Sequence, residues 1–190
     1  MTAAQDILDA ISKKGEVFNN GKFDLNIFGI RSASTVANRF DDFIGCVWGK
    51  RNEKFRLWQA TTDPGLYWLK NPMKYSGTAI LCPNQYRGVY RLDMHGGKYE
   101  AICQRNGPVT VFRDSNKDEN LDFDKVESGM FGINLHKQWG DDETVDKDGA
   151  GCQVFRHTAD FYRLMSLCYN QIRWHNWHSF TYTLLLEDEL

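Results

Sequence analysis

Two periodicities alternate along the chain and predict a mostly β protein with a helix near each end. Residues 3–14 place Ile7, Leu8 and Ile11 on one helical face, and Gly15 follows as the predicted C-cap. Apolar and polar positions then alternate in short runs separated by turn residues, as is typical of strands. The strands predicted in this way are residues 23–30, 43–48, 54–60, 78–82, 86–92, 98–104, 109–113 and 130–136.

Helical spacing returns in the last quarter of the chain. Thr158 is the predicted cap of a helix that begins at Ala159, and apolar residues recur at helical spacing after it. Residues 179–186 alternate again and predict a closing strand. We therefore expect an α+β fold dominated by β structure, with a main domain over residues 40–190 and an N-terminal extension of one helix and one strand over residues 1–39.

Composition narrows the class of partner. The chain has 190 residues, of which 42% are apolar, enough for a hydrophobic core. The net charge of −2 predicts neither nucleic acid nor an anionic membrane as a partner. No apolar run approaches the roughly 18 residues that span a bilayer, so no membrane insertion is expected.

The sequence also bears on where the protein is made. Its N-terminus lacks a basic start followed by an apolar stretch, so we expect no secretory signal and synthesis in the cytoplasm. The five cysteines are an odd number without paired short spacing, which favours reduced thiols over a disulfide framework.

One histidine and one cysteine carry the main chemical hypothesis. His136 ends an alternating run, and Cys152 follows sixteen residues later, within Gly149-Ala150-Gly151-Cys152. An adjacent imidazole activates a thiol by accepting its proton or by stabilising the thiolate as an ion pair. Glycine beside the cysteine, here Gly151, lets backbone amides approach a substrate oxyanion. The alternative is a buried structural cysteine near a core histidine.

The residues around this pair resemble the catalytic segment of the L,D-transpeptidase family of peptidoglycan enzymes. Ile133-Asn134-Leu135-His136 matches the family's Ile-x-Ile-His strand, and Gly151-Cys152 matches the end of its Ser/Thr-His-Gly-Cys motif. Residues 61–67, Thr-Thr-Asp-Pro-Gly-Leu-Tyr, are similar to the family's Thr-Pro-x-Gly-x-Phe/Tyr segment, so the resemblance spans roughly residues 40–170.

The same segment departs from the family pattern at three positions. Gly149 stands where the family has Ser or Thr, Ala150 where it usually has His, and Val154 where Arg or Asn is common. The run Ala-Gly-Cys-Gln-Val at residues 150–154 is also similar to that of phage-encoded and bacterial proteins.

The resemblance implies a cysteine peptidase or transpeptidase that acts on peptidoglycan stem peptides without a cofactor. Cys152 would be the nucleophile, His136 the base and Gly151 part of the oxyanion site. Together with the expected lack of a secretory signal, the resemblance implies a phage enzyme that reaches the cell wall during lysis or as a virion component. The alternative is a structural or adsorption protein of a virion, in contact with other virion proteins, that keeps the fold without catalysis.

Three polar residues upstream are candidates for substrate binding. Tyr86, Arg87 and His95 lie on or just after a predicted strand that precedes the catalytic segment. An arginine is suited to bidentate recognition of a substrate carboxylate.

Two further segments raise the question of metal binding. Residues 114–122 carry oxygen ligands at alternate positions, as calcium loops do, but Glu119 and Lys125 occupy positions where such loops need Gly and Glu. His175 and His178 lack an identifiable third ligand, so an aromatic surface is expected there and no metal site is predicted. The acidic run between His136 and Cys152 is either a solvated loop or a lid over the nucleophile.

Overall fold

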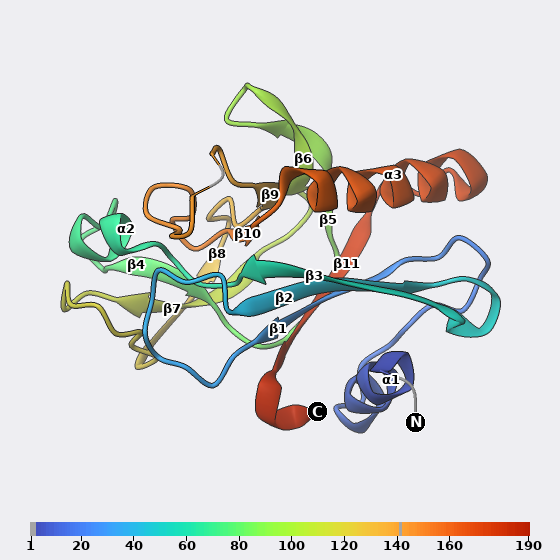
Figure 1. Ribbon diagram of the computed structural model, residues 1–190, viewed down its shortest axis with the longest axis horizontal. Helices are drawn as coiled ribbons and strands as arrows, with labels where there is room; N and C mark the ends of the chain where they lie inside the picture. Colours follow the sequence, from blue (N-terminus) through green and yellow to red (C-terminus); the bar gives the residue numbers. More distant parts are fainter. Residues whose placement is uncertain (1–2, 141) are drawn as a thin grey trace.

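The computed structural model describes residues 3–140 and 142–190, so Asp141 of the acidic run lies outside the described residues. Its strands form two sheets (Figure 1). The larger sheet closes on itself, in the order β1 (Asn26–Arg31), β11 (Phe180–Leu186), β5 (Gln85–His95), β6 (Tyr99–Gln104), β9 (Leu135–Lys137), β10 (Gln153–Phe155), β3 (Lys54–Thr61) and β2 (Asp42–Trp48). The smaller sheet has the order β4 (Thr78–Leu81), β7 (Val109–Asp114) and β8 (Lys125–Gly129).

Three helices lie around these sheets (Figure 1). They are α1 (Ala3–Lys13), α2 (Leu66–Lys70) and α3 (Thr158–His175), and the single turns η1 (Lys50–Asn52) and η2 (Glu187–Glu189) are 3₁₀ helices. None of the helices in the described part of the chain has the length and apolar character needed to cross a membrane. The two sheets and the few helices around them confirm the predicted β-rich α+β fold.

The N-terminal helix forms as the sequence predicts. Ile7, Leu8 and Ile11 are buried together against the sheet, and Gly15 follows with a left-handed φ of 72°. The strand after it, β1, pairs antiparallel with β2 and parallel with β11. The predicted N-terminal extension, of which residues 3–39 are described, therefore supplies strand β1 to the closed sheet.

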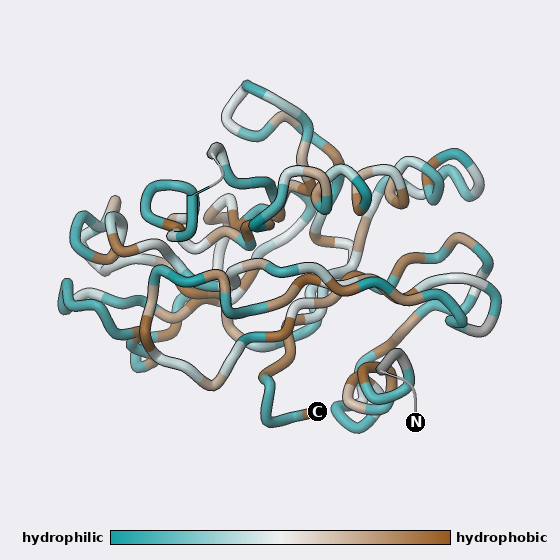
Figure 2. Tube along the Cα trace, viewed as in Figure 1, coloured by the Kyte–Doolittle hydropathy of each residue, from teal (hydrophilic) through white to brown (hydrophobic). Residues whose placement is uncertain are grey.

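The second long helix, α3, packs on the opposite side of the larger sheet from α1 (Figure 1). Its residues Phe161, Leu164 and Cys168 are fully buried in the main core. The predicted cap was wrong by one residue: the helix already includes Thr158, and His157 takes the cap position. Figure 2 shows apolar stretches along the strands and hydrophilic residues in many of the connecting loops.

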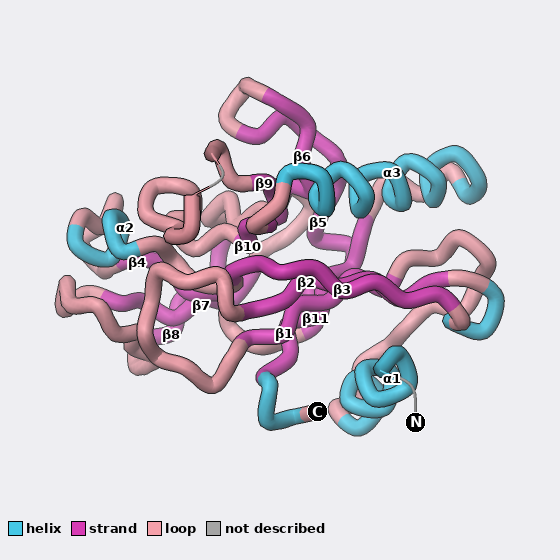
Figure 3. The backbone as a smooth tube through the Cα atoms, in the orientation of Figure 1, coloured by secondary structure: helices cyan, strands magenta, loops and turns pink. Residues whose placement is uncertain are grey.

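One predicted strand was wrong in its extent. Residues 130–136 were expected to be a single strand, but residues 130–134 have no regular structure, β8 ends before them and β9 begins after them. The interruption coincides with Gly132, whose φ of 73° takes the backbone out of the extended region. The long connection from β9 to β10, in its described residues 138–140 and 142–152, also lacks helices and strands and lies near α2 (Figure 3).

Candidate functional site

The candidate nucleophile lies at the start of a parallel strand pair. Strands β9 and β10 run side by side, with Val154 opposite His136 and Gln153 opposite Leu135. One residue earlier on each strand, the Asn134 amide donates a hydrogen bond to Cys152 Sγ at 3.4 Å. Cys152 is thus opposite Asn134, two residues before His136 on the neighbouring strand.

Cys152 and His136 also share one side of this pair. Leu135 and Phe155 belong to the main core, whereas Cys152 and Val154 form a separate cluster with residues outside the sheet. Side chains alternate between the two faces of a strand. His136, opposite Val154, therefore lies on the same side as Cys152.

The hydrogen bonds of His136 define which ring nitrogen is free. Its Nδ1 lies 2.8 Å from the carbonyl oxygen of Lys137, and because a carbonyl only accepts, Nδ1 carries the proton. Nε2 is then the nitrogen with a free lone pair. The ring of His95 stacks on the His136 ring, with centroids 4.2 Å apart, and His95 Nδ1 contacts Asn134 Nδ2 at 3.0 Å.

Burial keeps both members of the pair uncharged. Burial, with a smaller contribution from the positive charge of His95, lowers the pKa of His136 to about 3. Burial likewise raises the pKa of the Cys152 thiol to about 11. The hydrogen bond from the Asn134 amide lowers this pKa, but by less than burial raises it. The resting pair at pH 7 is therefore a neutral thiol and a neutral imidazole, and not a preformed thiolate–imidazolium ion pair.

The lowered pKa of His136 predicts an acid-sensitive fold. A histidine whose pKa falls on folding stabilises the fold above its unfolded pKa of 6.5, and this stability is lost as pH falls towards 3. At about 1.4 kcal/mol per pH unit, protonation of His136 alone lowers the free energy of unfolding by on the order of 3 kcal/mol at pH 4. Urea unfolding at pH 7 and pH 4 should show that the free energy of unfolding falls less between these pH values in His136→Gln than in the wild type. An equal loss in both proteins would contradict the buried neutral histidine.

A buried glutamine holds the irregular segment that faces the thiol. Gln104 Oε1 accepts hydrogen bonds from three successive amides, at residues 131, 132 and 133, over 3.1, 2.9 and 3.1 Å. Its Nε2 donates to the carbonyls of Gly107 and Gly129. The segment held in this way carries the Gly132 carbonyl, which lies 3.5 Å from Cys152 Sγ.

A second buried glutamine holds the other side of the nucleophile. Gln153 Nε2 lies 3.3 Å from the carbonyls of Thr62 and of Gly151, while its Oε1 accepts from the Tyr182 hydroxyl at 2.9 Å. Neither glutamine was predicted to be a site residue, because a polar residue in a strand normally indicates a solvent-facing position.

Gly151 meets a steric demand as well as a conformational one. Its φ is 104°, and a Cβ at this position would collide with the carbonyl oxygen of Ala79. The amides of Gly151 and Cys152 donate to none of the described backbone carbonyls. These two amides are therefore the candidate oxyanion donors.

The two sequence segments that resemble the transpeptidase family meet in space. The Gly65 amide donates to the Gly149 carbonyl at 2.8 Å. Beneath this contact, Arg31 donates to the Thr62 hydroxyl at 3.0 Å, and Asp42 accepts from the Thr62 amide at 2.6 Å. A buried charged network thus supports the loop that carries the nucleophile.

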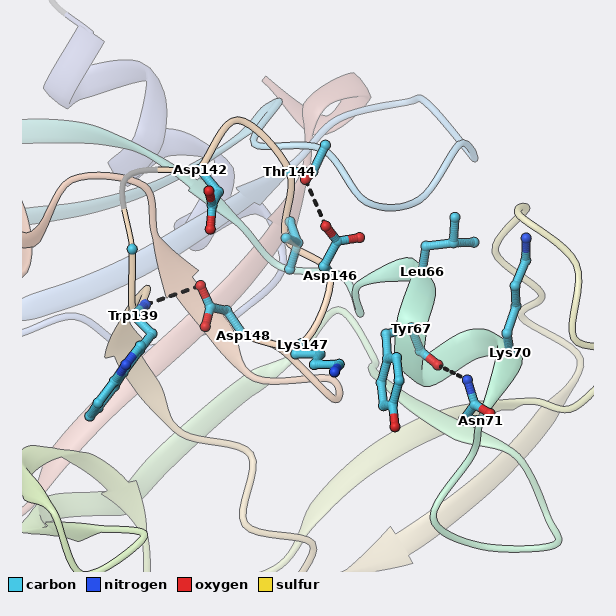
Figure 4. A pocket seen from close by; sticks show the side chains of 12 residues that line it. Leu66, Tyr67, Lys70, Asn71, Trp139, Asp142, Thr144, Asp146, Lys147 and Asp148 are labelled. Atoms are coloured by element: carbon cyan, nitrogen blue, oxygen red, sulfur yellow. Dashed lines mark hydrogen bonds between the residues drawn. The ribbon is translucent and has the colours of Figure 1, made fainter.

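The acidic loop covers the nucleophile and shapes two cavities. Val145 packs on Cys152, which is 9% exposed. A cavity of about 340 Å³ is lined by both His95 and His136. A second cavity, of about 590 Å³, lies between the loop and α2 (Figure 4). Both are lined by Trp139, Lys147 and Asp148. This arrangement favours the lid interpretation over a freely solvated loop.

The predicted substrate-binding residues do not lie together. His95 stacks on His136, whereas Tyr86 is buried and donates its hydroxyl to the carbonyls of Cys82 and Thr110. Arg87 is exposed on β5. Only His95 of the three therefore lies against the candidate catalytic pair.

The described residues contain no cluster of three or more His, Cys, Asp or Glu side chains that could hold a metal ion. His175 Nε2 lies 3.1 Å from Asp24 Oδ1, and its ring lies beside that of Trp177. His178 Nε2 instead lies 3.0 Å from Asn176 Oδ1. The five cysteines are all free.

The loop after β7 is expected to bind calcium weakly. Asp118 accepts from the Asn120 amide, and Asp114 accepts from the Asp122 amide, so oxygens of the loop are engaged internally. Burial raises the pKa of Asp114 to about 6, which also disfavours its charged form. Calorimetric titration should show no dissociation constant below roughly 10⁻⁴ M. Micromolar binding, or a melting temperature raised by calcium and lowered again by a chelator, would overturn this expectation.

Comparisons with models of protein families, with curated proteins and with solved structures find no match to this chain.

Proposed function

We propose that this protein is a cysteine acyl-transfer enzyme that acts on the stem peptides of peptidoglycan. The observation that carries the proposal is the placement of Cys152 and His136 on one side of adjacent parallel strands. The free amides of Gly151 and Cys152 and the lone pair on His136 Nε2 are the other groups that acyl transfer needs.

In the proposed first step, Cys152 Sγ forms a bond to the carbonyl carbon of a stem-peptide bond while His136 Nε2 accepts the thiol proton. The amides of Gly151 and Cys152 stabilise the oxyanion of the tetrahedral intermediate. The carbon–nitrogen bond then breaks, and His136 returns the proton to the leaving amine. The products are a thioester on Cys152 and a free amine.

In the second step, an acceptor attacks the thioester and releases the thiol. Water gives a peptidase, and an amine gives a transpeptidase. The neutral resting pair implies that the thiol loses its proton during the attack, with substrate already bound. The resemblance to phage-encoded proteins further supports an enzyme delivered to the cell wall by a phage, in lysis or as a virion component.

Digestion of purified peptidoglycan tests the reaction class. We expect new stem-peptide fragments or altered crosslinks by mass spectrometry, intact glycan strands, and no activity after thiol alkylation. A glycosidase would instead use two carboxylates, of which the acidic loop offers several. New reducing sugar ends that persist after alkylation would refute the cysteine mechanism.

A virion structural protein without catalysis is the second candidate. The covered thiol, its raised pKa and the glycine and alanine at positions 149 and 150 favour it. Binding to intact peptidoglycan or to virion proteins, with no product of digestion at any pH, would support this candidate over the enzyme.

A further inference from the structure

A buried cluster at the end of β3 places two carboxyl groups beside one arginine. Arg31 of β1 is 2% exposed, Asp42 of β2 is fully buried, and Asp63, two residues after β3, is 5% exposed. Arg31 Nε lies 2.8 Å from Asp63 Oδ1. The other titratable side chains that interact with these charges are Asp41, Cys82, Tyr86 and Tyr182. None of these four carries a positive charge, so they do not balance the second carboxylate.

The two carboxyl groups of the cluster have different hydrogen-bond environments. Asp42 accepts from the Ser32 amide at 2.7 Å and from the amide and the hydroxyl of Thr62 at 2.6 and 2.8 Å. Asp63 Oδ1 is buried and has no hydrogen-bond partner among residues 3–140 and 142–190. Donors stabilise an ionised carboxyl group, whereas burial and a neighbouring carboxylate disfavour it.

This asymmetry favours an ionised Asp42 and a protonated Asp63. Burial raises the pKa of Asp63 to about 7, and the charge of Asp42 adds to the rise while Arg31 opposes it. Burial also raises the pKa of Asp42, but there three hydrogen bonds and Arg31 oppose the rise. The cluster therefore holds one proton near neutral pH.

Arg31 also holds the backbone that supports the nucleophile. Its Nη2 donates to the Thr62 carbonyl at 2.9 Å. Gln153 Nε2 lies 3.3 Å from the same carbonyl and 3.3 Å from the Gly151 carbonyl. The Gly151 carbonyl and the Cys152 amide belong to one planar peptide unit, so a contact to the carbonyl also orients the amide. A chain of contacts therefore runs from the guanidinium to one of the two candidate oxyanion donors.

The Nε proton of Arg31 lies between two acceptors. Nε donates to the Thr62 hydroxyl at 3.0 Å, whereas Asp63 Oδ1, although 2.8 Å away, is not in a hydrogen-bonding direction. A hydrogen bond to an ionised group is about twice as strong as one between neutral groups. An ionised Asp63 would therefore draw the guanidinium away from Thr62.

We propose that Arg31 is a positioning residue for the oxyanion donors and that a proton on Asp63 keeps it in place. With Asp63 neutral, Arg31 holds Thr62 and, through Gln153, the Cys152 amide. As pH rises through about 7, Asp63 ionises, Arg31 turns to its carboxylate, and the amide loses its fixed direction. The proton and the loop geometry do not depend on the proposed function, whereas their effect on turnover rests on it.

A pH titration followed by NMR tests both parts of this inference. The full chain, labelled with ¹³C at the aspartate carboxyl groups and with ¹⁵N, is titrated from pH 5 to pH 9. We expect a buried aspartate with a midpoint at about pH 7, and the same midpoint for the amides of Gly151 and Cys152. Asp114, whose pKa burial raises to about 6, is the internal reference for a raised carboxyl group outside the cluster.

Two substitutions separate the proton from the arginine. Asp63→Asn keeps the cluster in its neutral form at every pH, so the carboxyl titration at about pH 7 should disappear and the amides of Gly151 and Cys152 should no longer titrate. Arg31→Lys keeps the positive charge but lacks the planar fork that reaches several acceptors at once. In this variant the two amides should be displaced already at pH 5, in the direction that the wild type shows above pH 7.

The control removes a carboxylate–arginine pair elsewhere in the fold. Asp93 of β5 is partly exposed and pairs with Arg91 and Arg105, and Asp93→Asn should leave all of these titrations unchanged. The consequence for turnover is a ratio of rates. Peptidoglycan cleavage by the wild type, relative to Asp63→Asn, should fall about tenfold from pH 6 to pH 9, because an oxyanion donor is misplaced.

A carboxyl titration that persists in Asp63→Asn, or amides of Gly151 and Cys152 that stay fixed from pH 6 to pH 9 in the wild type, overturns the inference. The wild-type amides decide it alone if Asp63→Asn does not fold. If carboxyl and amides titrate as expected but peptidoglycan is never cleaved, the positioning role stands and the enzyme proposal fails. If peptidoglycan is cleaved with a rate ratio that does not change with pH, the enzyme stands and the positioning role fails.

Discussion

Replacing Cys152 with alanine is expected to lower peptidoglycan cleavage by roughly four orders of magnitude or more, because the variant cannot form the thioester. Fragment release from purified peptidoglycan, measured by liquid chromatography and mass spectrometry, gives the rate. The fold should be retained, since the side chain that is lost lies in a small outer cluster and not in the main core.

Cys82→Ala is the matched control for this result. Cys82 is 8% exposed, against 9% for Cys152, and burial raises the pKa of each thiol to about 11. The two cysteines therefore differ in position and not in burial or acidity. Comparable losses in both variants would indicate a general effect on the fold and would count against Cys152 as the nucleophile.

Replacing His136 with alanine is expected to lower the turnover number by about two to four orders of magnitude at pH 7, as removal of a general base does. The wild-type rate should stay high down to about pH 4, because the pKa of His136 is about 3 and the base remains neutral there. A rate that falls with an apparent pKa of 6 to 7 would contradict the buried base.

His95→Ala provides the comparison for the histidine. It removes the ring stacked on His136 and the contact to Asn134, but it leaves the hydrogen bond from His136 to the Lys137 carbonyl. We expect a loss of about tenfold, well below that of His136→Ala. If His136→Ala keeps wild-type activity, His136 has no part in the mechanism.

The elements that follow a local pattern could be predicted from the sequence, and those set by distant contacts could not. The helix over residues 3–13 and the closing strand repeat one period over several residues. Strand β10 has three residues, too few for a pattern. The break at residues 130–134 depends on Gln104, which lies about thirty residues away in the chain.

The same distinction holds for the candidate site. Cys152 and His136 could be named because both lie in a short motif with a recognisable spacing. Gln153 could not, because its position beside the nucleophile is set by Tyr182 and Thr62, which only folding brings to it.

The most direct test of the central claim is the mass of the protein during turnover. Wild-type protein is mixed with a stem tetrapeptide, quenched in acid within milliseconds to seconds, and analysed intact and after proteolysis. We predict an added mass equal to the acyl part of the tetrapeptide, located on the fragment that contains Cys152 and absent from Cys152→Ala. Cleavage of the tetrapeptide at the same rate by Cys152→Ala, or an acyl group found on a different residue, would contradict the account.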